Sequence, residues 1–421
     1  MKISETKFYS VTFVVLLLLQ NYLPSFRVNI IIQFAVLLLF LFTNRIIVSR
    51  GFLRIIIPIL IVFFIGFIGM SVHDYNRINI LKDIFHFSKP ISGLAIGYFF
   101  FKKIGNFKIF VQAIVITALL CAVRHFAYLL ITGYIFTGSV DAMRIDNKDN
   151  FLELFALFFL FFYKKFQNEE LFISRRKMQF IKYFILLSCL FYFSRTMLIG
   201  AIILLVSIKQ YTIITTKSLK IIGGFVLGIL LFYTVLFSVK IERNKPGVEA
   251  FLYKMKIAPS EIFKSKINRE DHTELWDHWR GYEAKRAFEL MNGNPMNYVV
   301  GCGHGSLVNL KFLAPLGDEN GKGMKYISEL HNGYMYILYK TGSVGMFFYL
   351  YLLYLLYKRI YKNQDMASIF ISAIGLFYFF STLIITGIYN ANDTIIFILG
   401  AMLFFSKSLN KTSYSVIQND K

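Results

Sequence analysis

The sequence predicts an all-α polytopic membrane protein with about twelve transmembrane helices and one large, partly helical loop outside the cytoplasm. Of its 421 residues, 56% are hydrophobic and 18% aromatic, which is more apolar surface than a soluble domain could bury. The apolar residues fall in runs such as Val11–Leu19, Ile30–Phe42 and Ile55–Met70. With their flanks, these runs approach the ~20 residues that span ~30 Å of hydrocarbon. In lipid they must be helical, because every backbone polar group needs an internal partner.

The apolar runs define twelve expected spans. The first is interpreted as a retained helix, because no small-residue cleavage site follows it. The spans near 88–101, 150–163 and 196–208 are the shortest. In chain order the expected spans cover residues 9–24, 28–43, 55–72, 88–101, 109–131, 150–163, 178–194, 196–208, 220–239, 332–357, 367–387 and 391–406.

The distribution of charge predicts the orientation of these spans. The chain carries 46 Lys and Arg against 24 Asp and Glu, a formal net charge of +22. With the N-terminus in the cytoplasm, the basic clusters at 45–54, 164–182 and 358–362 fall on the cytoplasmic side and satisfy the positive-inside rule, while the outer side is nearly balanced. The basic excess therefore reflects topology and contact with anionic lipid, and no nucleic-acid partner is expected. An even number of spans places both termini in the cytoplasm.

Missing motifs exclude several reaction classes. The sequence has no P-loop, which argues against an ATP-driven pump, and no HExxH motif. It also has no DxD motif of the kind that holds a metal on a nucleotide sugar. Its three cysteines, Cys121, Cys189 and Cys302, show no disulfide or metal-ligand spacing. Since no ATP is available at the outer face, a reaction there needs a substrate that is already activated.

One connection is far longer than the others and faces outward. Within it, the stretch Asp271–Met291 predicts one amphipathic helix that ends at Asn292–Pro295. The glycine-rich turn Gly301–Ser306 is a connector or, alternatively, an anion nest of backbone N–H groups. The chain is thus one membrane domain in three parts: helices one to nine at 1–239, the large loop at 240–331, and helices ten to twelve with a cytoplasmic tail at 332–421.

Three arginines could serve an anionic substrate, because a guanidinium donates two parallel hydrogen bonds to a phosphate. Arg195 follows Ser194 at the outer boundary of the membrane, and Arg280 lies on the loop helix, where Glu283 at i+3 can hold its guanidinium. Arg124 lies inside the fifth span, where an ionisable group usually faces the bundle interior. The alternatives are a boundary anchor for Arg195, a surface ion pair for Arg280 and snorkelling for Arg124.

His331 is the most suggestive single residue. It lies where the large loop meets the tenth span and is followed by Asn332. A neutral imidazole with a pKa near ~6.5 could act as a general base toward a hydroxyl. The alternative is a hydrogen bond at the start of the helix. Gly342 and Gly345 lie ~16–21 Å further along, too deep for chemistry beside His331, and are expected to let helices pack closely.

These elements together resemble the O-antigen ligase and Wzy-type O-antigen polymerase superfamily. His331-Asn332, with Gly342 and Gly345 after it, is similar to the signature of that superfamily, and Ser194-Arg195 resembles its Ser-Arg element at the outer end of a span. The resemblance keeps the superfamily's order over roughly residues 140–400. Its other elements are the run Trp279–Ala284, Asn294-Pro295, the turn Gly301–Gly305 and, more weakly, Arg144 with Asn150.

The resemblance implies a GT-C-like, multi-pass protein of a bacterial inner membrane that works in lipopolysaccharide or other polysaccharide biosynthesis. Such a protein is a metal-independent glycosyltransferase without a cofactor, and its donor glycan is linked to undecaprenyl diphosphate. Its partners would be these lipid-linked glycans, membrane lipids and a chain-length regulator protein. At the periplasmic face, Arg195 and Arg280 would bind the diphosphate and His331 would activate the acceptor hydroxyl. Further substrate contacts are expected from Arg124, by inference from its position, and from Arg144, Trp279, Tyr282, Glu283 and Asn332.

Two sibling activities share this signature. A polymerase transfers the growing chain to an incoming lipid-linked repeat unit, whereas a ligase transfers the finished chain to lipid A–core. The run Trp279–Ala284 and the run after Asn332 favour an O-antigen or exopolysaccharide polymerase, and the short outer loop 132–149 argues against it. A lipid-linked oligosaccharide flippase would place substrate groups near the bilayer midplane, often within internal repeats, and no repeat is visible in this sequence. A non-enzymatic scaffold is the remaining class.

Overall fold

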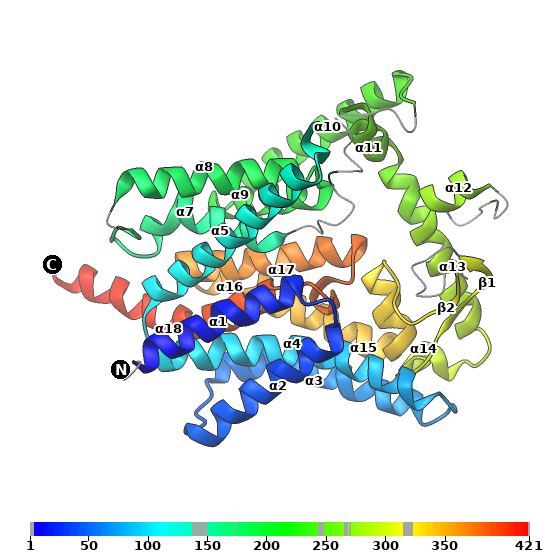
Figure 1. Ribbon diagram of the computed structural model, residues 1–421, viewed down its shortest axis with the longest axis horizontal. Coiled ribbons are helices and arrows are strands. Elements are labelled where there is room, and N and C mark those ends of the chain that lie inside the picture. The colour runs from blue at the N-terminus through cyan, green and yellow to red at the C-terminus, as the bar shows by residue number, and fades with distance from the viewer. Residues whose placement is uncertain are drawn as a thin grey trace.

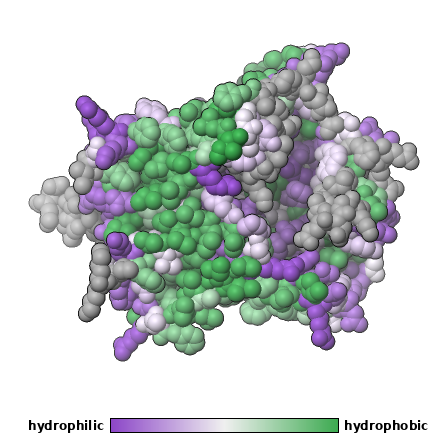
Figure 2. Space-filling view, viewed as in Figure 1, coloured by the Kyte–Doolittle hydropathy of each residue, from purple (hydrophilic) through white to green (hydrophobic). Residues whose placement is uncertain are grey.

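The long helices lie roughly side by side, with most of the large loop gathered at one end and both chain termini at the other (Figure 1). The computed structural model describes residues 4–136, 143, 150–172, 174–242, 248–264, 268, 271–314 and 323–419. In the view coloured by hydropathy, an apolar band crosses the molecule between two polar ends (Figure 2). Exposed side chains such as Leu39, Phe42 and Phe64 belong to this apolar surface.

A helix occupies each of the twelve expected spans. Five of these helices, α2, α3, α5, α10 and α17, are long and apolar enough to cross a membrane, so the chain is a multi-pass membrane protein. α9 and the apolar start of α18 are shorter. The twelve helices are α1 Glu5–Tyr22, α2 Phe26–Thr43, α3 Arg50–Met70, α4 Arg77–Ile104, α5 Phe107–Ile131, α7 Phe151–Phe162, α8 Arg175–Phe191, α9 Arg195–Ile208, α10 Thr216–Ser238, α15 Gly333–Tyr357, α17 Met366–Ile384 and α18 Ile395–Asn419.

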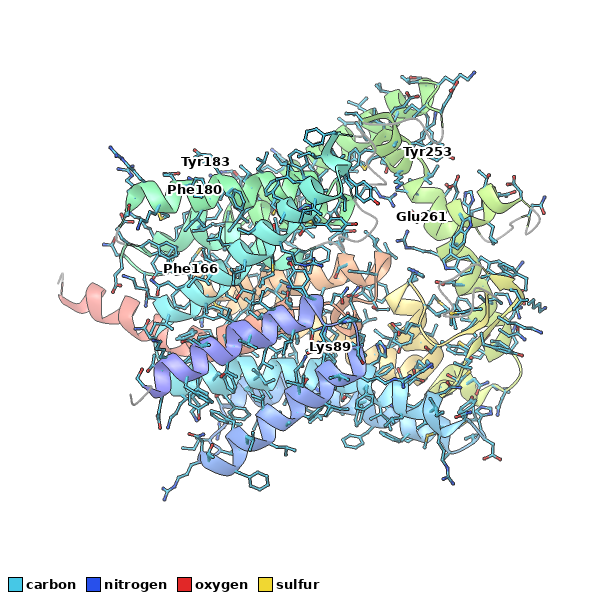
Figure 3. The ribbon with its side chains drawn as sticks, in the orientation of Figure 1. Lys89, Phe166, Phe180, Tyr183, Tyr253 and Glu261 are labelled. Carbon is cyan, nitrogen blue, oxygen red and sulfur yellow. The ribbon has the colours of Figure 1, made fainter. Side chains whose placement is uncertain are left out.

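α4 is twice as long as its expected span, because it begins at Asn76, whose side chain caps the first turn. Its first half carries charged residues that hydropathy treats as loop, yet they are buried with partners. The Asp83 carboxylate lies 2.5 Å from the Lys340 ammonium, and the Lys89 ammonium donates to the Asn390 carbonyl at 2.6 Å (Figure 3 labels Lys89). These partners offset the free-energy cost of burying the charged groups, so the helix continues beyond its apolar run.

The large loop contains short helices, as predicted, and also a two-stranded sheet that the sequence did not predict. Its elements are α11 Val248–Phe263, α12 His272–Asp277, α13 Trp279–Met291, α14 Met296–Val300 and the antiparallel pair β1 Val308–Ala314 and β2 Met324–Ile327. Short helical turns elsewhere are η1 Tyr134–Phe136, η2 Tyr163–Lys165, α16 Arg359–Lys362 and η3 Gly387–Tyr389.

The prediction of one continuous helix over 271–291 is also wrong. The chain breaks at His278, which has a non-helical backbone (φ −123°, ψ 22°). The imidazole Nδ1 of His278 lies 2.9 Å from the Glu274 carbonyl, and its backbone N–H donates to the same oxygen. The side chain thus helps to end α12, and α13 begins in a new direction at Trp279.

α15 is broken at Gly342, where the backbone (φ 63°, ψ −168°) lies in a region that is accessible essentially only to glycine. The break leaves the carbonyls of Tyr339 and Lys340 to accept the N–H groups of Cys302 at 2.7 Å and Gly303 at 3.0 Å. A Cβ at Gly342 would lie 2.3 Å from the Val299 carbonyl oxygen, so the expectation of close packing at Gly342 is confirmed.

The turn Gly301–Ser306 is therefore a connector. Besides its bonds to α15, the N–H of His304 donates to the Gly66 carbonyl of α3, and the N–H of Gly305 donates to the Asp83 carboxylate of α4. Because these N–H groups already have acceptors within the protein, the alternative of an open anion nest is not supported.

Candidate active site at the loop end of the membrane helices

Arg195 occupies the first position of α9, at the loop end of the helices. A tight turn precedes it, in which Phe193 adopts a left-handed backbone (φ 44°) and Ser194 caps the helix by accepting the N–H of Met197 at 3.2 Å. The turn aims the Arg195 side chain at α11, where its Nη1 donates to the Lys254 carbonyl at 2.5 Å.

Arg280 is the second residue of α13 and ties the loop to the membrane helices. Its Nε donates to the carbonyl of Ile384, the last residue of α17, at 2.9 Å. Terminal carbonyls of a helix lack intrahelical partners, so this bond satisfies one of them.

Both arginines converge on one carboxylate, that of Glu261 on α11. Arg195 Nη2 lies 3.1 Å from Glu261 Oε2, and Arg280 Nη1 donates to Glu261 Oε1. The three side chains are 15–20% exposed, so each is shielded but still in contact with solvent. Figure 3 shows Glu261 on the side of the loop that faces the ends of the membrane helices. We call Arg195 and Arg280 the arginine pair.

Sequence reasoning missed Glu261. Its only signal is that it is the single acidic residue between Glu249 and Glu270, in a strongly basic stretch. The two arginines that it joins are 66 and 19 residues away along the chain, so no local spacing connects them.

His331 lies directly before the N-cap of α15 and is bonded to Glu283. Its Nδ1 lies 3.0 Å from Glu283 Oε1, and its backbone N–H donates to Oε2 at 2.9 Å. Glu283 is 1% exposed and His331 is 51% exposed, so a buried carboxylate orients a ring that reaches solvent. The sequence predicted that Glu283 holds the guanidinium of Arg280. In the structure Glu283 instead bonds to His331, which lies 48 residues further along the chain.

The charge of Glu283 affects the protonation of His331. Burial lowers the pKa of His331, but the hydrogen bond and the negative charge of Glu283 outweigh this effect and raise the pKa above its ordinary value. Arg280 opposes the increase and Glu329 supports it. Glu329 itself pairs with His86 of α4 at 2.8 Å. The negative charges of Glu283 and Glu329 thus act on the imidazole against the positive charge of Arg280.

Three other predicted binding residues hold the fold around this site. Trp279 is 5% exposed and packs against Tyr282 and Phe312, and the Tyr282 hydroxyl donates to the Leu310 carbonyl of β1. Asn332 caps α15 by accepting the N–H of Met335 at 3.2 Å. These contacts fix α13 and the start of α15, and any direct contact of the three residues with substrate stays a prediction.

The remaining predicted residues lie elsewhere or cannot be placed. Arg124 is exposed, with its guanidinium 4.0 Å from the centre of the Tyr22 ring of α1, and its contact with substrate stays a prediction. Its neighbour His125 faces inward instead and contacts Ser188 at 2.9 Å. Asn150 caps α7 and donates to Glu153. Arg144 lies outside the described residues.

Among the described residues, no group of three or more His, Cys, Asp or Glu side chains is arranged to hold a metal ion.

The comparison with protein families matches residues 180–350 to the model described as O-antigen ligase. The matched segment begins in α8 and ends in α15, so it contains Arg195, Glu261, Arg280, Glu283 and His331. Neither the curated proteins nor the solved structures yield a match to this chain.

Proposed function

We propose, from the match of residues 180–350 to the O-antigen ligase family model, that the protein is a polysaccharide polymerase of the bacterial inner membrane. Members of this family are glycosyltransferase-type enzymes that act on lipid-linked glycans. The proposed reaction transfers a growing glycan from undecaprenyl diphosphate to a hydroxyl of an incoming lipid-linked repeat unit. The observation that carries the proposal is the convergence of two arginines on one carboxylate beside an oriented histidine.

The arginine pair suits a diphosphate leaving group. As the acceptor oxygen bonds to the anomeric carbon, the bond from that carbon to the diphosphate oxygen breaks, and negative charge develops on the diphosphate. Arg195 lies at the start of α9 and Arg280 is bonded to the end of α17, so both are positioned to neutralise that charge. Glu261 now occupies both guanidinium groups, so a diphosphate would compete with this carboxylate for them.

His331 suits the role of general base. Its Nδ1 faces Glu283, which leaves Nε2 as the ring nitrogen for the acceptor hydroxyl. The hydroxyl proton would move to Nε2 as the new glycosidic bond forms, and the buried Glu283 would stabilise the resulting imidazolium. Glu283 is then a positioning residue that acts through His331.

A ligase is the second candidate, and the description of the matched family favours it. Both siblings need the same donor chemistry, so the arginine pair does not distinguish them. We favour the polymerase on the composition of the Trp279–Ala284 run and of the run after Asn332. A flippase is disfavoured, because the predicted binding groups gather at one end of the helices.

The test is an assay with purified protein in nanodiscs, supplied only with undecaprenyl-diphosphate-linked repeat units. We expect a ladder of lipid-linked oligomers that is lost in His331→Ala. If transfer occurs only when lipid A–core is added, the protein is a ligase. If neither acceptor supports transfer, the transferase proposal fails and a transporter becomes the better hypothesis.

A further inference from the structure

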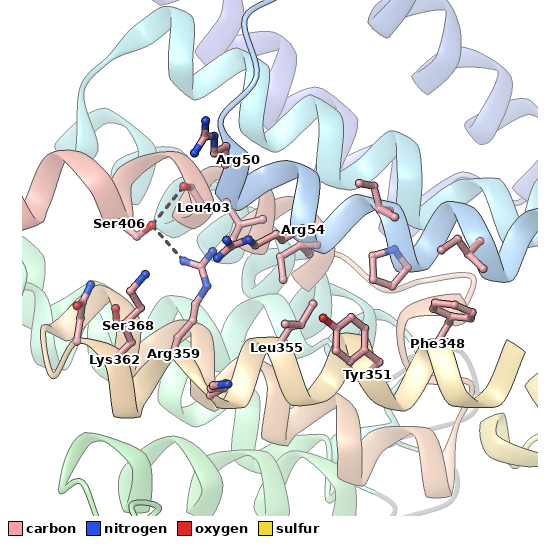
Figure 4. Close-up of a pocket in the computed structure, with 17 residues that line it drawn as sticks. Arg50, Arg54, Phe348, Tyr351, Leu355, Arg359, Lys362, Ser368, Leu403 and Ser406 are labelled. Atoms are coloured by element: carbon pink, nitrogen blue, oxygen red, sulfur yellow. Dashed lines mark hydrogen bonds between the residues drawn. The ribbon is translucent and has the colours of Figure 1, made fainter. Parts of the chain in front are cut away.

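A second basic site lies at the end of the helices opposite the arginine pair. There α3, α15, α16, α17 and α18 enclose a pocket of about 840 Å³ (Figure 4). Five basic residues line it, two at the start of α3 and three at the junction of α15 and α16. By the positive-inside rule this end faces the cytoplasm. The five are Arg50, Arg54, Lys358, Arg359 and Lys362, and we call this pocket the basic groove.

Among the described residues, the cations of the basic groove form no salt bridge. Arg359 donates from Nη1 to the Ser406 hydroxyl at 3.3 Å, and Arg54 lies beside it (Figure 4). The nearby Asp365 instead caps α17, where its carboxylate accepts the N–H and the hydroxyl of Ser368.

The electrostatics around Arg359 agree with this geometry. Burial lowers the pKa of Arg359 to about 10; Asp365 opposes that decrease, and the positive charge of Arg54 adds to it. An anion between the exposed Arg54 and the half-buried Arg359 would offset the repulsion between their guanidinium groups.

The other wall of the groove is apolar. Ile57, Pro58 and Ile61 of α3 face Phe348 and Leu355 of α15 across it. Ile57 is 47% exposed, although it lies in a helix that is apolar enough to cross the membrane. The groove therefore runs from a cationic mouth into the hydrocarbon layer, along the direction that an acyl chain follows.

We propose that the basic groove binds one anionic glycerophospholipid of the cytoplasmic leaflet, with its phosphate at Arg54 and Arg359 and an acyl chain along α3 and α15. Charge complementarity selects the occupant: a lipid with a net negative charge satisfies the cations, and its chain covers the apolar wall. Free phosphate would leave that wall exposed. The proposal does not depend on the transferase function, because it uses a different end of the molecule.

The test is binding of phosphatidylglycerol to the purified full-length protein by native mass spectrometry, with phosphatidylcholine as the neutral-headgroup probe. We expect phosphatidylglycerol to bind at least about tenfold more tightly than phosphatidylcholine. The double variant R54Q/R359Q should lose that preference. The matched control R175Q/R176Q removes two exposed arginines from the start of α8, on the same side of the membrane, and should keep it.

If the two double variants lose the preference for phosphatidylglycerol equally, delocalised surface charge attracts the lipid. That result would overturn the proposal. If millimolar inorganic phosphate displaces the lipid, and the lipid-bound signal recovers fully when the phosphate is removed, the groove is a free-anion site. That result would also overturn the proposal. If R54Q/R359Q does not fold, Ile57→Trp serves as the second variant, because it fills the groove at its apolar wall without changing the charge. That variant should lose bound lipid at an unchanged melting temperature, and unchanged lipid binding in it would reject the groove.

Discussion

At the scale of single residues, Arg280 has to supply more than positive charge. Its Nε holds the end of α17 while its Nη1 reaches Glu261, a division that a lysine cannot reproduce. We expect Arg280→Lys to lower the turnover number at least about tenfold with normal membrane insertion. Initial rates of glycan transfer measure this, with the exposed Lys285→Arg on the same helix as the control. Wild-type turnover in Arg280→Lys would remove this residue from the site.

Glu261 competes with the donor for the arginine pair under the proposed mechanism. A partly shielded ion pair contributes on the order of 1 kcal/mol. Glu261→Gln should therefore lower the KM for the lipid-linked donor about fivefold. Glu274→Gln is the control, because Glu274 pairs with Lys264 in the same loop. A higher KM in Glu261→Gln would show that the carboxylate positions the arginines and does not compete.

The protonation of His331 predicts how the rate depends on pH. A general base must be neutral, so the rate should fall as the pH drops through the pKa of His331, which Glu283 raises. Glu283→Gln removes the charge that raises this pKa. The acidic limb of the kcat/KM profile should then move to lower pH, while Glu289→Gln on the same helix leaves it unchanged. If the acidic limb does not move in Glu283→Gln, Glu283 does not influence the group that titrates.

Sequence reasoning proposed Arg195, Arg280 and His331 as site residues, because a family resemblance fixes their order along the chain. It could not find Glu261, and it assigned Glu283 to the wrong partner. Both failures have one cause: i, i+3 and i+4 spacing reveals contacts within a helix, whereas these carboxylates contact residues on other elements.

At the scale of elements, apolar runs located the long helices, since hydropathy measures what faces lipid. Hydropathy underestimated α4, where Asp83 and Lys89 are buried with partners from α15 and from the segment before α18. It also missed the break at His278 and the pairing of β1 with β2, where Val308 lies opposite Ile327. Those features depend on local backbone bonds and on contacts within the loop.

The break in α15 makes Gly342 sensitive to substitution. Gly342→Ala forces a Cβ into an unfavourable backbone region and within 2.3 Å of the Val299 carbonyl oxygen. We expect a loss of about 2–4 kcal/mol in stability, seen as a lower melting temperature in detergent. Gly224→Ala is the control, because nothing lies within 4 Å of that position on α10. Equal melting temperatures for Gly342→Ala and wild type would contradict the break.

At the scale of the whole molecule, the orientation in the membrane assigns the two polar ends to opposite compartments. The exposed Lys325 lies on β2, and the exposed Lys217 begins α10. We expect a membrane-impermeant maleimide to label Lys325→Cys in intact spheroplasts and to label Lys217→Cys only after lysis. The reverse pattern would invert the topology and place the arginine pair in the cytoplasm.

α10 is the least buried of the five helices that are long and apolar enough to cross a membrane. In its most apolar stretch only 6% of the residues are buried, and it is joined to α11 by bonds from Tyr233 to Met255 and from Lys256 to Val239. A change in its tilt exchanges lipid contacts for other lipid contacts, at a cost of fractions of a kcal/mol per Å of mismatch. Such a tilt would shift α11, and with it Glu261, against arginines fixed on α9 and α13. Bilayer thickness would then change the affinity for the donor, without any protein partner.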